Sequence, residues 1–198
     1  MSVRIIVPHR GLAAAKTRLA AVLEDAEREG LARRLLERVL AVVHEACPDV
    51  VVITPSAELE PLVAAAGARL IVQHGMGLNV GLAEARREAL ADGVETLAVF
   101  HGDLPNLGVE DVAALLAAVP APVGVAIAPD RARRGTNGLA LRPPDAIAFR
   151  FGIGSYAAHR DAAEAAGVAI AEVYRPGLAF DLDTPADLAR WLELGDAA

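Results

Sequence analysis

The sequence is poor in cysteine and in aromatic residues, and it has no surplus of basic residues. Cys47 is the single cysteine, so no disulfide can form within the chain. The 26 acidic residues outnumber the 19 basic ones and give a formal net charge of -7. This charge argues against nonspecific binding to nucleic acid or to an anionic membrane. It does not exclude a small anionic ligand.

Long hydrophobic runs are also missing. Arg, Glu, Asp, His and Pro interrupt every apolar stretch before it reaches the roughly 20 residues that a membrane-spanning helix needs. The apolar run in the opening residues 1–11 is too short for a secretory signal peptide. Together with the single cysteine, these features lead us to expect a cytoplasmic protein.

The hydrophobic residues that are present follow an alternating pattern of strands and helices. They make up 54% of the chain, and because only 4% of residues are aromatic, Ala, Val, Leu and Ile supply most of them. The pattern predicts strands at residues 3–7, 50–54, 69–73, 96–100, 123–128, 138–142, 168–173 and 178–180. It predicts helices at residues 27–46, 58–66, 82–91 and 109–119, another capped by Ser155, and a last one beginning at Thr184 and Pro185. We therefore expect one α/β domain over residues 1–198, with a mainly parallel sheet covered on both faces.

In such sheets ligands bind beyond the carboxyl ends of the strands, and the loop after the first strand is rich in cations. Arg10, Lys16 and Arg18 lie close together there, and Gly11 allows a tight turn. Three cations suit a polyphosphate, although the loop is not a Walker A motif, since Ala15 stands where that motif has its second glycine. Alternatively, these cations simply solvate the first turn of a helix.

Three aspartates follow predicted strands and are candidate metal ligands. Asp103 comes directly after the fourth buried strand, and a carboxylate at such a place can bind Mg²⁺ or cap a helix. Asp181 and Asp183 are separated by one residue, so in an extended strand both would face the same side. Two acids on one side repel each other unless a cation compensates them. Alternatively, Asp183 helps to cap the last helix.

Two glycine-containing loops are candidates for binding an anion. Thr136 lies in one of them, and the other, around Gly152, leads into the helix that begins near Ser155. The free amide groups at a helix N-terminus attract anions, although a simple capped helix after a turn has the same pattern. A further segment with Gly77 and Asn79 could line a base pocket or form a plain turn. The five histidines lack the spacing of metal ligands and form no recognisable catalytic triad.

Several short motifs occur here in a characteristic order. They are V-P-x-x-x-L-x-x-A-K-T-R-L, G-L-N, G-D-L-P, G-T-N-G-L, F-G-x-G-S followed by His159, and G-L-A-F-D-L-D-T-P-A-D-L. In this order the set resembles the guanylyltransferase family that makes coenzyme F-420, a deazaflavin redox carrier, over nearly the whole chain. The resemblance implies a three-layer, Rossmann-like nucleotidyltransferase fold with a mainly parallel, mixed sheet. It also implies transfer of GMP from GTP to a three-carbon phospho-acid, with release of pyrophosphate.

The resemblance also implies roles for individual residues. The acceptor would be held by Thr136, Gly152 and Ser155, and one or two Mg²⁺ ions by Asp103, Asp181 and Asp183. Catalysis would rest on Lys16 and Asp103, and the nucleotide would contact Arg10, Gly11, Lys16, Arg18, Gly77 and Asn79. Two positions depart from the family pattern, since His9 stands where a small apolar residue is usual and Arg10 where lysine is usual.

The acceptor is the least determined part of this interpretation. The resemblance implies phosphoenolpyruvate in bacterial members and 2-phospho-L-lactate in archaeal ones, with 3-phosphoglycerate as a further alternative. The Ala- and Arg-rich composition is typical of a GC-rich bacterial genome and so favours phosphoenolpyruvate. Transferases for sugar phosphates or molybdopterin usually begin with an L-A-G-G-x-x-R loop, which is absent here. A non-catalytic nucleotide-binding protein on the same fold stays open, as does a homodimer.

Overall fold

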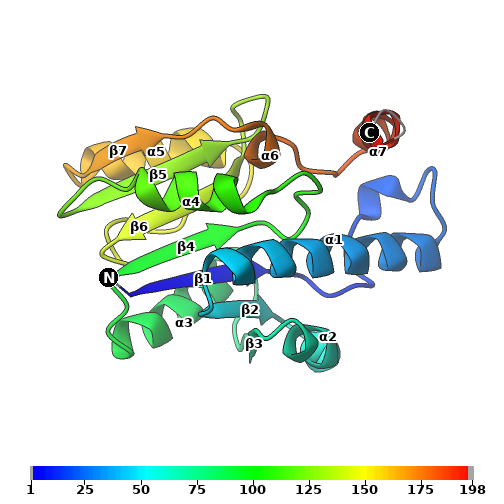
Figure 1. Ribbon diagram of the computed structural model, residues 1–198, viewed down its shortest axis with the longest axis horizontal. Coiled ribbons are helices and arrows are strands. Elements are labelled where there is room, and N and C mark those ends of the chain that lie inside the picture. The colour runs from blue at the N-terminus through cyan, green and yellow to red at the C-terminus, as the bar shows by residue number, and fades with distance from the viewer. Residues whose placement is uncertain (1, 196–198) are drawn as a thin grey trace.

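The computed structural model describes residues 2–195 and is built around one seven-stranded sheet (Figure 1). Its strands are β1 (Val3–Pro8), β2 (Val50–Thr54), β3 (Arg69–Val72), β4 (Thr96–Phe100), β5 (Gly124–Pro129), β6 (Thr136–Arg142) and β7 (Ala169–Glu172). They lie in the order β3-β2-β1-β4-β6-β5-β7. Only β6 runs antiparallel to its neighbours, β4 and β5. The expected mainly parallel, mixed α/β sheet is therefore confirmed.

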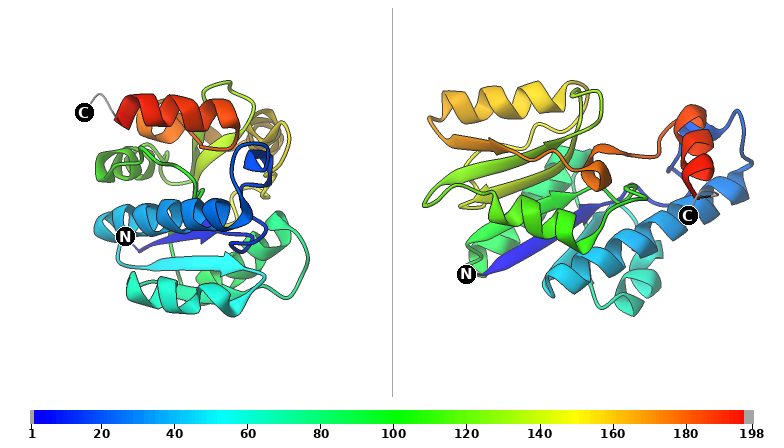
Figure 2. Two further views of the ribbon diagram at one scale, coloured as in Figure 1. Left: turned by 90° about the vertical axis from the view of Figure 1, so that its right-hand side faces the viewer. Right: turned by 45° about the horizontal axis from the view of Figure 1, so that its top comes forward.

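The helices pack on both faces of this sheet, as the two further views in Figure 2 show. They are α1 (Asp25–Ala46), α2 (Glu60–Ala65), α3 (Leu78–Ala91), α4 (Val109–Ala117), α5 (Ser155–Ala165), α6 (Pro176–Ala179) and α7 (Pro185–Gly195). Short 3₁₀ turns, η1 (Thr17–Leu19) and η2 (Ala57–Leu59), precede α1 and α2. Among the described residues, no helix is long and apolar enough to cross a membrane.

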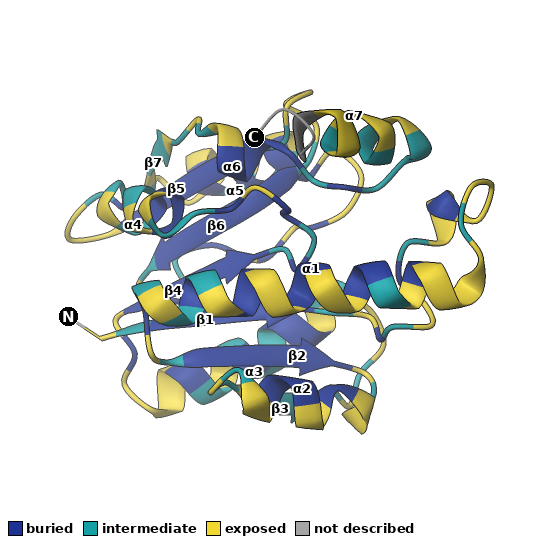
Figure 3. Cartoon of the chain, turned by 45° about the vertical axis from the view of Figure 1, so that its right-hand side comes forward, coloured by how far each residue is buried: buried dark blue, intermediate teal, exposed yellow. Residues whose placement is uncertain are grey.

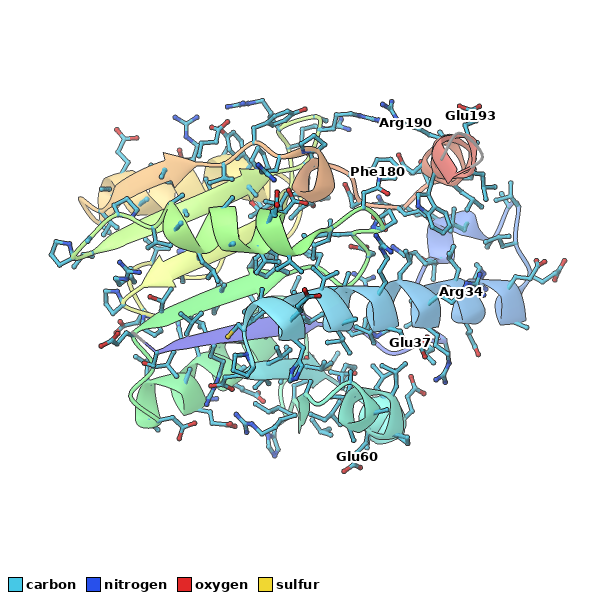
Figure 4. All side chains as sticks on the ribbon, in the orientation of Figure 1. Arg34, Glu37, Glu60, Phe180, Arg190 and Glu193 are labelled. Carbon is cyan, nitrogen blue, oxygen red and sulfur yellow. The ribbon has the colours of Figure 1, made fainter. Side chains whose placement is uncertain are left out.

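Two apolar layers hold the helices to the sheet. Residues of α1, α2, α4 and α6 pack on one face, and residues of α3 and α5 pack on the other. Figure 3 shows the strands buried and α1 alternating between buried and exposed turns. Along α1, Leu36 and Leu40 are fully buried, whereas Arg34 and Glu37, labelled in Figure 4, are exposed. This alternation follows from apolar residues repeating every three or four positions.

A third, smaller apolar cluster lies beside the carboxyl edge of the sheet. Leu19 of η1, Leu31 and Leu35 of α1 and Leu182 are buried together, and Trp191 of α7 packs against them. The cluster thus joins the loop after β1 to the segment that precedes α7, two regions far apart in the sequence. It positions the cationic loop next to residues 181–183.

The segment predicted as a strand at residues 178–180 is different in the structure. Pro176–Ala179 forms the short helix α6, and residues 180–183 belong to no strand. Pro176 stands at the start of the helix, where its fixed backbone angle is favourable. Four helix starts also differ from the prediction: α1 begins at Asp25 instead of residue 27, and α2 at Glu60 instead of residue 58. Helix α3 begins at Leu78, four residues earlier than expected, and Ser155 is the first residue of α5 rather than its cap.

Candidate functional site

A cleft of about 840 Å³ runs along the carboxyl edge of the parallel strands. The loop after β1, the ends of β2, β3 and β4, the start of β6 and the start of α5 all contribute to its walls. Because β6 is antiparallel, its first residue reaches the same edge as the carboxyl ends of its neighbours. The volume is in the range of small-molecule sites, and the position is where ligands bind in open α/β sheets.

Backbone contacts fix the cationic loop after β1. The Gly11 N–H donates to His9 Nδ1 at 3.0 Å, and the Leu12 N–H donates to Glu58 Oε1 at 2.8 Å. Gly11 has a φ of +91°, and a Cβ atom there would lie 2.9 Å from Glu58 Oε1. A larger residue would therefore be strained at position 11 and would push against Glu58. Burial lowers the pKa of His9 to about 4, which suits its role as an acceptor.

Lys16 is the most constrained residue of the site. Its φ of 54° lies in the left-handed region, which costs a non-glycine residue about 1 kcal/mol. Its ammonium is buried and donates to Asp103 Oδ2 at 2.7 Å and to Asp183 Oδ1 at 3.1 Å. Burial alone would lower the pKa of Lys16, but these carboxylates raise it above its ordinary value. Lys16 is thus a charged group held at a defined point of the cleft.

The three aspartates meet at the cleft but have different partners. Burial opposes ionisation of Asp103, yet the Lys16 ammonium together with His101 holds its pKa below the usual range. Asp181 accepts from Asn137 Nδ2 at 3.3 Å, and burial followed by the charge of Asp103 raises its pKa. Asp183 also pairs with the exposed Arg18 at 3.6 Å.

The chemistry of these aspartates fits a divalent cation. Asp103 Oδ1 is buried, and no hydrogen-bond partner for it occurs within residues 2–195. The raised pKa of Asp181 likewise marks a carboxyl group that lacks a compensating charge. Among residues 2–195, no three His, Cys, Asp or Glu side chains are already grouped as a metal site. The Lys16 ammonium bridges Asp103 and Asp183 instead.

Uncharged groups form another part of the cleft wall, next to Asp130, whose carboxylate accepts from the Gly135 N–H at 2.9 Å. Thr136, the first residue of β6, and Ser155, the first residue of α5, are both buried and line the cleft. Gly152 and Gly154 have φ values of +134° and +72°, and a Cβ atom at either would meet nothing within 4 Å. The backbone conformation, and not crowding, therefore explains these glycines. In the first turn of α5 the Ser155 N–H donates to the Gly152 carbonyl at 3.1 Å and the Tyr156 N–H to the Arg134 carbonyl at 3.2 Å, so the positive end of the helix dipole is the main attraction for an anion there.

Asn79, which the sequence predicts to contact the nucleotide, is hydrogen-bonded to the backbone of another loop. Its Nδ2 donates to the Phe151 carbonyl at 2.8 Å, and the Phe151 N–H donates to its Oδ1 at 2.9 Å. Both ends of the amide are therefore engaged by the backbone just before Gly152. Gly77, the residue before α3, does line the cleft. Asn79 thus connects α3 to the loop that leads into α5.

Some residues of this site escape prediction from motif spacing. His9 and Glu58 close the cationic loop, and Asn137 connects Asp181 with the Leu178 carbonyl, to which it donates at 2.9 Å. His159 is fully buried beside Thr136, and burial lowers its pKa to about 4. The motifs G-T-N-G-L and F-G-x-G-S with a following histidine contain Asn137 and His159. Neither motif predicts the hydrogen-bond partners of the Asn137 and His159 side chains.

Comparison with known proteins gives a consistent result at the level of sequence. A family model described as guanylyl transferase, CofC like, matches residues 3–197. Phosphoenolpyruvate guanylyltransferase of Sphaerobacter thermophilus is 44% identical over 190 residues, which cover 95% of this chain and 91% of the relative. The enzyme of the same name from Rubrobacter xylanophilus is 46% identical over 194 residues, covering 96% and 93%. A 3-phospho-D-glycerate guanylyltransferase of Phenylobacterium zucineum is 41% identical over 194 residues, covering 92% and 86%.

Solved structures agree on the fold. A protein from Desulfovibrio desulfuricans G20, assigned to the nucleotide-diphospho-sugar transferases, aligns with a TM-score of 0.78 over 98% of this chain and 88% of its own. A nucleotidyl transferase from a Methanothermobacter species aligns with a TM-score of 0.69, covering 98% and 97%. Sequence identity is only 20% and 15%, so these structures establish the nucleotidyltransferase-like α/β fold and nothing finer.

Proposed function

The chain belongs to the CofC-like guanylyl transferase family, and we propose that it transfers GMP from GTP to phosphoenolpyruvate, releasing pyrophosphate, in the biosynthesis of coenzyme F-420. One observation carries the proposal beyond family membership. The cleft has Lys16 and its carboxylate partners on one side and the uncharged groups of Thr136 and Ser155 on the other. One chain supplies all these residues.

We assign the two substrates to the two sides of this cleft. The cationic loop with Arg10, Lys16 and Arg18 suits the triphosphate of GTP, because three cations offset the charge of a polyanion. The start of α5 and the Thr136 hydroxyl suit the phosphate and carboxylate of the acceptor. Gly77, the residue before α3, lines the cleft, and we place the nucleoside of GTP beside it.

The proposed reaction is an in-line displacement at phosphorus. A phosphate oxygen of the acceptor attacks the α-phosphorus of GTP, an O–P bond forms, and the bond from that phosphorus to the β-phosphate bridging oxygen breaks. The attacking oxygen already carries negative charge, so no side chain has to remove a proton. The remaining task is to offset repulsion between two anions and to stabilise the departing pyrophosphate. Lys16 is the buried cation suited to this task.

We further propose that the enzyme uses Mg²⁺, held by Asp103 and by Asp181 or Asp183. The buried, unpartnered Oδ1 of Asp103 and the raised pKa of Asp181 support this assignment. When bound, the ion would supply positive charge next to the phosphate oxygens of the nucleotide. Lys16 would then exchange a carboxylate contact for a phosphate contact, since its ammonium now bridges Asp103 and Asp183.

A second acceptor is favoured by one specific observation. A relative that covers most of this chain, at 41% identity, is named for 3-phospho-D-glycerate. This acid and phosphoenolpyruvate share three carbons, a phosphate and a carboxylate. They differ in which carbon carries the phosphate, the second in phosphoenolpyruvate and the third in 3-phosphoglycerate, in the geometry of that carbon, and in the hydroxyl group on the second carbon of 3-phosphoglycerate.

The test is a pyrophosphate-release assay with GTP or ATP and each of three acceptors in parallel: phosphoenolpyruvate, 3-phosphoglycerate and 2-phospho-L-lactate. We expect release with GTP and phosphoenolpyruvate, a much slower reaction with ATP, and loss of release when the metal is chelated with EDTA. Preference for another acceptor would correct the substrate but keep the reaction. Absence of release with all three acceptors in the presence of GTP and Mg²⁺ would refute the proposal.

A further inference from the structure

A single buried imidazole connects the two parts of the uncharged wall. His159 lies on the first turns of α5 and is 0% exposed, so it cannot touch a ligand in the cleft. Its Nδ1 lies 3.1 Å from Thr136 Oγ1 on β6. Its Nε2 accepts from the Arg150 N–H at 2.9 Å, two residues before Gly152. The ring thus contacts both segments that we assign to the acceptor.

These contacts determine where the ring carries its proton. A backbone N–H can only donate, so Nε2 must be the acceptor towards Arg150 and carries no hydrogen. A neutral imidazole then has its hydrogen on Nδ1, which has Thr136 Oγ1 and the Ser155 carbonyl as acceptors and cannot itself accept from the Thr136 hydroxyl. Burial lowers the pKa of His159 to about 4, although a hydrogen bond with the Ser155 backbone opposes that shift. The ring is therefore neutral at physiological pH.

The direction of this hydrogen bond constrains the Thr136 hydroxyl. Because Nδ1 carries a hydrogen, it cannot accept from the Thr136 hydroxyl, whose own hydrogen must be directed elsewhere. Within residues 2–195, the hydrogen bond to His159 is the one that this hydroxyl makes. Thr136 is 2% exposed and lines the cleft, so an anion bound there is an available acceptor for its hydroxyl hydrogen. An anion in the cleft needs a donor of this kind.

We propose that His159 is a positioning residue that fixes the Thr136 hydroxyl as a hydrogen-bond donor to the phosphate or carboxylate oxygens of the acceptor. The inference rests on the proposed function, because it assigns the acceptor to the side of the cleft that Thr136 lines. The opposite orientation would direct an oxygen lone pair at an anion. The ring decides between the two orientations without touching the acceptor.

Simple packing is the competing explanation for His159. Its ring meets Phe151 edge to face, with centroids 4.8 Å apart, and a buried ring of any kind would fill that space. A packing role predicts that substitutions alter stability and leave the two substrates equally affected. A positioning role predicts that the effect falls on the acceptor and depends on which ring nitrogen is replaced.

Two substitutions separate the ring nitrogens. In His159→Asn the side-chain amide lies near the position of Nδ1, so it can still donate to Thr136 while the Arg150 N–H loses its acceptor. In His159→Gln the amide reaches the position of Nε2, so the Arg150 contact is kept and the donor to Thr136 is lost. Each variant leaves one buried polar group unpaired, so we expect similar falls in melting temperature.

The expected kinetic effects differ between the two variants. For His159→Gln we expect the acceptor KM to rise roughly tenfold or more, the usual effect of losing one hydrogen bond to a charged group. The KM for GTP should stay within about twofold. For His159→Asn the acceptor KM should stay near the wild-type value. In the Thr136→Val background, the difference between Asn and Gln at position 159 should disappear, because the hydroxyl that transmits it is gone.

The state of the ring provides a readout that does not depend on turnover. In ¹⁵N NMR spectra of the wild-type protein, His159 should show a protonated Nδ1 and an unprotonated Nε2, with the signal assigned by its absence in His159→Asn. The reverse tautomer would overturn the inference. So would equal acceptor KM values for the Asn and Gln variants when the wild-type protein is active. Wild-type protein that is inactive with all three acceptors would instead count against the proposed function.

Discussion

The two sides of the cleft are built from different kinds of group. The charged side consists of Lys16, Arg18, Asp103 and Asp183, which form ion pairs with one another. The neutral side consists of Thr136, Ser155, His159 and the backbone around Gly152, which are joined by hydrogen bonds. Both sides face anions in the proposed reaction, yet Lys16 and its ion-pair partners lie on only one of them.

This difference separates stabilisation of charge from recognition. Charge on phosphorus and on the leaving group changes during the reaction, and cations placed there in advance stabilise the transition state. The acceptor keeps its own charge until it attacks, so oriented hydroxyl and amide donors are enough to hold it. A small molecule can then be distinguished by shape, because each donor points in one direction. If the proposed reaction is correct, the neutral side would therefore govern which acid reacts, and the charged side would govern how fast.

The largest expected effect comes from removing a charge on the charged side. Asp103→Asn leaves the side chain nearly the same size but removes the carboxylate that pairs with Lys16 at 2.7 Å. We expect kcat/KM for GMP transfer to fall about 10²- to 10³-fold, the usual cost of losing one such electrostatic group. Initial rates of pyrophosphate release at saturating Mg²⁺ measure it.

A matched control is available on α2. Glu60, labelled in Figure 4, is exposed and does not line the cleft, so Glu60→Gln removes the same formal charge and should leave the rate unchanged. Melting temperatures of both variants show whether Asp103→Asn still folds. A folded Asp103→Asn protein with the wild-type rate would remove Asp103 from the proposed chemistry.

The fold was largely predictable because its signals are local. Apolar runs of strand length, ended by glycine or proline, gave β2 (Val50–Thr54) and β4 (Thr96–Phe100) with the observed bounds. The exception, α6 (Pro176–Ala179), has an apolar composition that suits a strand or a helix equally, and only its packing against buried residues decides the outcome. Short apolar runs carry this ambiguity in any sequence.

The site was predictable only in part, and the division follows the two sides of the cleft. Charged residues after strands stand out in a sequence, so Lys16, Asp103 and Asp183 could be proposed from their positions. The neutral side depends on pairs such as Asn79 with Phe151, which are 72 residues apart. Neither residue type indicates such a partner, and the hydrogen-bond directions follow only from the folded geometry.

A smaller effect is expected from acid, and it concerns the neutral side. Burial holds the pKa of His159 at about 4 in the folded protein, against an ordinary value of 6.5. Between these values the unfolded chain binds more protons, so the free energy of unfolding decreases as the pH falls. This residue alone contributes a loss of about 2 kcal/mol between pH 6.5 and pH 4.5. Asp103 stays ionised over this range, because its pKa is lowered.

Urea unfolding of wild-type protein and His159→Gln at several pH values isolates this contribution. Other titrating groups, His9 included, are present in both proteins and cancel in the difference. The stability advantage of the wild-type protein should be largest near pH 7 and shrink as the pH falls towards 4.5. A constant difference over this range would mean that His159 is not kept neutral by folding.

The smallest expected effect tests whether the comparison extends to α3. Asn79 was predicted beside the guanine or ribose, but its amide is bound to the Phe151 backbone. If it serves the neutral side, Asn79→Ala loosens the loop before Gly152, and the acceptor KM rises roughly tenfold with little change in the KM for GTP. If Asn79 instead binds the guanine base, the KM for GTP rises and the preference for GTP over ATP weakens. Arg87→Ala, an exposed change on the same helix, is the control and should alter neither KM. A selective effect on GTP would place Asn79 with the nucleotide and would show that the hydrogen bonds to Phe151 do not confine this residue to the acceptor side.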